Sequence, residues 1–101
     1  SRIRELAACE REELRFTADY AEHQATLSRI ETLEKDTLPN LVRRVKAAQL
    51  AYQVSKIPMT AVYEAHHAEL ESRQQLLAQR VALARLSARL RYFSVGDAND
   101  N

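Results

Sequence analysis

The fold is decided by the stretch Leu50-Ala51-Tyr52-Gln53-Val54-Ser55-Lys56-Ile57-Pro58-Met59-Thr60-Ala61-Val62-Tyr63-Glu64-Ala65. Apolar residues at helical spacing stand on both sides of a short breaker. Ile57 precedes a proline, which pushes its backbone toward an extended conformation, and Pro58 or Thr60 can open a new helix. The stretch therefore predicts that one long helix ends, the chain reverses at residues 55–59, and a second helix returns.

The first helix is predicted from about Ile3 to Val54, with Pro39 as its one strong interruption. Around this proline an apolar stripe recurs at steps of three and four residues: Leu38, Leu41, Val45, Ala48 and Tyr52. Because this spacing does not reset at Pro39, we expect a kinked but continuous helix there. A fresh helix start after Asp36-Thr37, with Pro39 in its first turn, is the alternative.

The second helix is predicted over residues 59–94 and carries two apolar lines. One line contains Leu76, Leu83 and Leu90, joined by Leu86 and Phe93, and the other contains Tyr63, Leu70, Leu77 and Ala84. Two adjacent lines with a seven-residue repeat indicate more than one neighbouring helix. Gly96, the only glycine of the chain, is expected to end this helix, and residues 97–101 are expected to form a disordered tail.

These patterns predict an all-α fold: one long, coiled-coil-like antiparallel helical hairpin over residues 1–96. The composition agrees, since 46% of the 101 residues are hydrophobic and 29% are charged, with one Gly and two Pro. A net charge of +1 does not point to nucleic acid. No apolar run approaches the roughly 20 residues that a membrane-spanning helix needs.

A metal site is the first chemical possibility to weigh. Glu64 and His67 are three residues apart, and His67 and Glu71 are four apart, so the three share a helix face with His66 beside them. One Glu-x-x-His motif supplies half of a carboxylate-bridged two-metal site. His23 lies far away on the first helix, so the matching half is missing. We interpret the group as exposed polar residues and predict no metal.

Catalysis is not indicated either. Cys9 is the only cysteine and has no histidine or cysteine at a spacing typical of metal or redox sites. The sequence contains no serine–histidine–acid pattern and no phosphate-binding glycine loop. We therefore expect neither an enzyme nor a cofactor.

The chain resembles the periplasmic helical hairpin in the second half of TolC-like outer-membrane efflux channels. The resemblance extends from about Glu13 to Gly96 and rests on Leu38-Pro39 in the first helix, Tyr52 and Val54 at the tip, Val62-Tyr63-Glu64-Ala65 at the start of the return helix, and the heptad helix from Leu70 to Tyr92. Two departures stand out. Ser55 occupies a position where the family usually has glycine, and Ala61 one where an acidic residue often helps to cap the helix, a role that Pro58 can replace.

The resemblance implies a transport function. Such a hairpin belongs to a trimeric channel in a Gram-negative outer membrane, held there by a β-barrel whose strands this chain lacks. Its periplasmic tip docks an adaptor protein, and an inner-membrane pump of the resistance-nodulation-division type supplies the energy for efflux. The tip residues expected to bind the partner are Tyr52, Ser55, Lys56, Ile57, Pro58, Met59 and Thr60.

Two alternatives stay open. The first is the α-hairpin of a periplasmic adaptor, which meets the same channel tips from the other side. It is less favoured because the arginine, leucine and serine that usually surround such a tip are not present in Lys56-Ile57-Pro58-Met59-Thr60. The second is a generic coiled-coil interaction module. Because the first predicted helix begins without a cap, we expect the chain to be a segment of a larger protein.

Overall fold

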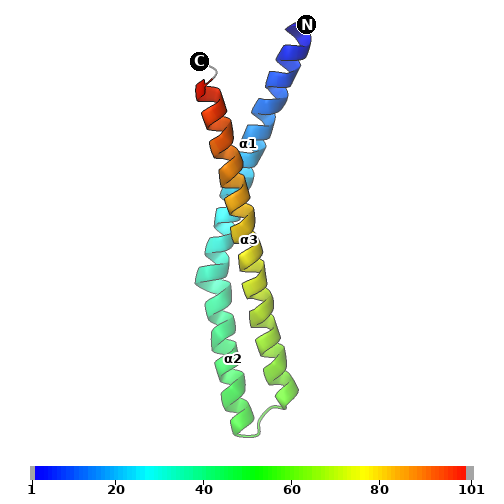
Figure 1. Cartoon of the computed structure of the whole chain (residues 1–101). Coiled ribbons are helices and arrows are strands. Elements are labelled where there is room, and N and C mark those ends of the chain that lie inside the picture. Colours follow the sequence, from blue (N-terminus) through cyan, green and yellow to red (C-terminus); the bar gives the residue numbers. More distant parts are fainter. Residues whose placement is uncertain (1, 100–101) are drawn as a thin grey trace. The chain divides into compact units, whose positions relative to one another are not determined.

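The computed structural model describes residues 2–99 of the chain and the side chains of residues 2–92. The described residues are almost entirely helical and contain no strand. Four elements follow one another: α1 (Arg2–Thr32), a π-helical segment (Leu33–Thr37), α2 (Leu38–Gln53) and α3 (Met59–Asn99). The all-α class and the reversal predicted near residues 55–59 are both confirmed, since residues 54–58 separate α2 from α3 (Figure 1).

The contacts divide the chain into two compact units. The tip unit comprises residues Ser28–Arg80, and the distal unit comprises Ser1–Leu27 together with Val81–Asn101. In the tip unit, α2 and the first part of α3 run side by side in opposite directions (Figure 1). In the distal unit, α1 contacts the last part of α3. Each unit therefore pairs two helical segments.

The core of the tip unit is a narrow seam between its two helical arms. Its buried hydrophobic residues are Ile30, Leu38, Val45, Val62, Ala65 and Leu76. Polar contacts bridge the same arms: an Arg80 guanidinium nitrogen lies 2.8 Å from Glu34 Oε1, and another from Arg29 lies 3.3 Å from Gln79 Oε1. Apolar burial supplies most of the pairing free energy, because exposed ion pairs contribute at most about 1 kcal/mol each.

The distal unit has a smaller described core, in which Leu86 and the fully buried Thr26 lie. Thr26 Oγ1 donates a hydrogen bond of 2.7 Å to the carbonyl of Glu22 in the preceding turn. Across the unit, His23 Nε2 lies 3.0 Å from Ser87 Oγ. The partner of His23 therefore comes from the returning helix, far away in sequence.

The burial of α3 follows the predicted first apolar line. Leu76 and Leu86 are buried, Leu83 and Leu90 are half-buried, and Arg73, Gln74 and Arg80 are exposed. Phe93 lies outside the residues whose side chains are described. The line thus faces the opposite arm, as the heptad spacing predicts.

The first arm stays helical through Pro39, as expected for a continuous helix, and Pro39 also lies in the first turn of α2, as in the alternative. The proline is the second residue of α2, and Thr37 and Leu38 both have right-handed helical backbone angles. The π-helical segment in front of the proline was not predicted from the sequence. There the Leu38 N–H donates to the Leu33 carbonyl, five residues back instead of four.

α3 ends later than the sequence predicted. The helix passes Gly96 and continues to Asn99, so the first residues of the predicted disordered tail are helical. A single glycine inside a helix costs only about 1 kcal/mol relative to alanine and does not by itself end the helix. Residues 100–101 lie outside the described part of the chain.

No helix among the described residues is both long enough and apolar enough to span a membrane.

Candidate docking site at the hairpin tip

The tip begins with a Schellman motif that closes α2. The Ser55 N–H donates to the Tyr52 carbonyl at 2.9 Å, and the Lys56 N–H donates to the Ala51 carbonyl at 2.8 Å. These two bonds satisfy carbonyls that the last turn of a helix would otherwise leave without partners. The motif therefore turns the chain sharply out of the helix axis immediately after Gln53.

Ser55 adopts the left-handed conformation that this motif requires, with φ of 61°. It is the only non-glycine residue with positive φ among the described residues. A Cβ atom costs roughly 1–2 kcal/mol in this region, so glycine is the usual occupant. The backbone thus has a glycine-like conformation at the residue where the family resemblance expects glycine.

Pro58 prepares the start of α3. It immediately precedes Met59, the first helical residue, and its carbonyl accepts a hydrogen bond of 3.1 Å from the Ala61 N–H. Proline suits this position because its φ is already close to the helical value, and a helix start leaves the first N–H groups without partners in any case. The reversal therefore needs only the five residues 54–58.

The tip residues form an open concavity. Its lining consists of Tyr52, Gln53, Ser55, Lys56, Ile57 and Pro58. Five of the seven predicted tip residues are therefore brought together, whereas Met59 and Thr60 lie exposed in the first turn of α3 and do not line it. Gln53 was missed, although its place as the last residue before the breaker could have indicated it.

This surface combines one positive charge with apolar groups that water reaches. Lys56 is the only charged residue between residues 52 and 60, and it is exposed. Around it lie apolar groups that water reaches: Val54 is 63% exposed, Tyr52 is 42% exposed and Ile57 is half-buried. A partner with apolar side chains and an acidic group would bury these surfaces favourably.

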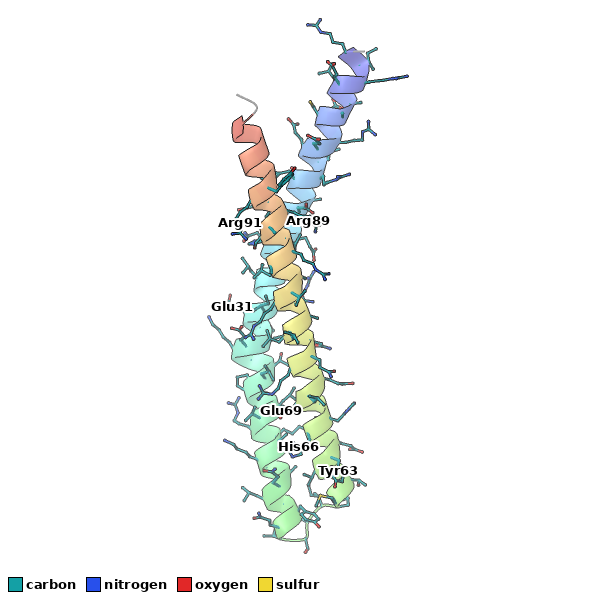
Figure 2. All side chains as sticks on the ribbon, viewed as in Figure 1. Glu31, Tyr63, His66, Glu69, Arg89 and Arg91 are labelled. Atoms are coloured by element: carbon teal, nitrogen blue, oxygen red, sulfur yellow. The ribbon has the colours of Figure 1, made fainter. Side chains whose placement is uncertain are left out.

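The polar group next to the tip forms pairs on the helix surface. His67 Nε2 lies 3.2 Å from Glu71 Oε1 one turn along the helix, and both side chains are well exposed. His66 Nε2 lies 3.3 Å from Gln49 Nε2 of the opposite arm. Figure 2 shows His66 and Tyr63 close to the tip end of α3. Within the described residues, no three His, Cys, Asp or Glu side chains gather as metal ligands.

Cys9 and the second apolar line of α3 are both exposed. Cys9 carries a free thiol at the surface of α1. Along α3, Tyr63, Leu70 and Leu77 are 67%, 54% and 63% exposed, and Ala84 is exposed as well. The two predicted lines therefore differ in role: the first line pairs the arms within the chain, and the second forms an outer stripe that faces solvent.

Comparison of the chain with protein-family models, with characterised proteins and with solved structures found no significant match.

Proposed function

We propose that this chain is the periplasmic helical hairpin of a trimeric outer-membrane efflux channel. Its tip would dock the periplasmic adaptor of a tripartite export system driven by a resistance-nodulation-division pump. The proposal starts from the resemblance carried by Leu38-Pro39, Tyr52, Val54 and Val62-Tyr63-Glu64-Ala65. The hairpin then contributes a binding surface and a wall of packed helices to transport, with no chemical step.

The conformation of Ser55 is the observation that carries the proposal. A family pattern with glycine at this position requires a backbone that glycine favours, and Ser55 has φ of 61°. Positive φ at a serine is uncommon, so its occurrence at this residue of all residues supports the alignment with the family pattern. The exposed tip around Lys56 and the exposed outer stripe also suit a protein that needs an adaptor and further helices.

The first test reverses the charge or polarity of the tip in the protein that carries this hairpin. Lys56→Glu and Ile57→Asp should strongly reduce efflux, while expression and trimer formation stay near normal. Few contacts within the chain are lost at a reversal, but a docked partner would have to desolvate the new carboxylate. Lys46→Glu is the matched control, because it makes the same charge change on an exposed residue of α2 away from the tip.

Tyr52→Ala should act differently from the two tip changes. As the last residue of the α2 stripe, Tyr52 is expected to contact a neighbouring helix of the channel, so its loss should increase passive leakage. Efflux and permeability assays on all three variants decide the matter. Unchanged transport and permeability in every variant would remove the tip from the mechanism and favour the generic coiled-coil module. Binding of the tip to an outer-membrane channel, in place of an adaptor, would instead favour the alternative that the chain is the hairpin of a periplasmic adaptor.

A further inference from the structure

The seam of the tip unit has an unbroken heptad pattern on the α3 side. The residues that face the opposite arm follow one another at alternating steps of three and four, and all are buried or half-buried: Val62, Ala65, Glu69, Ser72, Leu76 and Gln79. Such spacing keeps one side of a helix against its neighbour over several turns. We call this regular row of α3 residues, against which the first arm packs, the α3 track.

Opposite this track, the first arm contains one residue more than an unbroken heptad pattern would. Between Ser28 and Thr37 its buried and half-buried residues are Ile30, Leu33 and Thr37. After the junction they include Leu38, Leu41, Val45 and Ala48, with Pro39, Val42 and Ala51 half-buried beside them. Both sets have steps of three and four, but the step between them is one. Unbroken spacing after Thr37 would bury Asn40, Arg44 and Ala47, and all three are exposed. The predicted stripe from Leu38 through Pro39 to Ala48 keeps its spacing, and the extra residue lies just before it, between Thr37 and Leu38.

The extra residue is accommodated in the Leu33–Thr37 π segment. A π turn contains one residue more than an α turn, as the hydrogen bond from the Leu38 N–H to the Leu33 carbonyl shows. The backbone on both sides of the segment stays helical. The arm consequently passes from the first set of seam residues to the second without leaving the α3 track.

Pro39 explains why the extra residue lies at this place. Proline has no N–H to donate and its ring clashes with the carbonyl four residues earlier in an α-helix, here that of Lys35. The hydrogen-bond ladder is therefore interrupted just before Pro39 whatever the register. A π segment that ends next to the proline uses an existing gap and leaves the remaining helix intact.

We infer that the Leu33–Thr37 segment and Pro39 together form a register-correcting device, which turns the tip-side half of the arm so that Leu38 and Val45 face α3. Without the correction, this half would present Arg44 to the seam and would rotate the tip residues with it. The device thus determines the face on which the tip is presented. This inference concerns the pairing of the two arms and goes beyond the proposed transport function.

The test compares a deletion with an insertion at the same place in the whole chain. Both are made with Pro39→Ala, which permits a continuous α-helix. Deletion of Asp36, an exposed residue of the segment, should restore unbroken heptad spacing and leave the thermal midpoint within about 5 °C of Pro39→Ala alone. Insertion of an alanine after Asp36 adds a second extra residue, rotates the tip-side half away from α3, and should lower the midpoint by about 10 °C or more.

The inference stands only if the insertion lowers the thermal midpoint more than the deletion does. If the segment had no role in register, deletion and insertion would each displace the tip-side half by one residue and would be equally harmful. Equal losses would therefore overturn the inference. A second measurement uses the deletion with Pro39 retained, which should be less stable because the proline then lies inside an α-helix, and Pro39→Ala should rescue it. Failure of this rescue would also contradict the proposed device.

Discussion

At the scale of single residues, Ser55 has a backbone conformation that the turn requires but that is unfavourable for a residue with a Cβ atom. The Schellman motif needs a left-handed residue after Val54, and a serine has to adopt φ of 61° there. We expect Ser55→Gly to increase the free energy of unfolding by about 0.5–1 kcal/mol. Relief of the Cβ strain, roughly 1–2 kcal/mol, outweighs the greater entropy of glycine in the unfolded chain.

Ser55→Ala is the matched control for this prediction, because it keeps the Cβ atom and removes only the hydroxyl. Chemical denaturation of the three proteins measures the difference. Ser55→Ala should stay close to the parent chain. A Ser55→Gly protein that is less stable than the parent would mean that the serine hydroxyl, and not the backbone conformation, explains the residue at this position.

At the scale of one element, α3 places two neighbouring leucines in opposite environments. Leu76 is 6% exposed in the seam, whereas Leu77 is 63% exposed on the outer stripe. Leu76→Ala should lower the free energy of unfolding by about 2–4 kcal/mol, since it removes buried methyl groups and leaves a cavity. Leu77→Ala should change the stability of the single chain by less than about 0.5 kcal/mol.

Adjacent positions on one helix make this pair a close comparison, because helix propensity changes equally in both variants. Urea unfolding at low protein concentration measures the two values without a contribution from association. Equal losses at Leu76 and Leu77 would show that the outer stripe is also buried within the chain. That result would contradict the assignment of the two lines to different roles.

At the scale of the whole molecule, both units leave large apolar side chains in contact with water. Leu50, Tyr63, Leu70 and Leu77 are exposed in the tip unit, as are Leu6 and Leu14 in the distal unit. Each large apolar side chain that becomes buried contributes roughly 1.5–3 kcal/mol. We therefore expect the chain to self-associate, with a sedimentation coefficient that rises with concentration.

The outer stripe provides the variant that tests this expectation. Changing both Leu70 and Leu77 to glutamine should raise the dissociation constant of the self-associated form at least tenfold, while helicity stays the same. Tenfold corresponds to about 1.4 kcal/mol of association free energy. Sedimentation velocity over a wide concentration range measures the effect. A parent chain that sediments as a folded monomer at every concentration would contradict the expected self-association.

The sequence by itself determined the features that depend on neighbouring residues. Ile57-Pro58 located the reversal, because a proline restricts the residue before it and its own φ. The spacing of Leu76, Leu83 and Leu90 predicted a helix with a buried line, because side chains on one face of a helix recur at a fixed interval. The position of that reversal was enough to predict five of the residues that line the tip concavity, out of seven proposed.

Only the tertiary structure decided which surfaces meet. The spacing of α3 allows either line to pair with the first arm, and the contacts across the seam select the line of Leu76 and leave that of Leu77 exposed. The same contacts explain the π segment before Leu38. Its extra residue is needed only because the parts of the arm before and after it must both face α3. Pairing depends on residues that are distant in the chain, and the spacing within one helix therefore does not specify it.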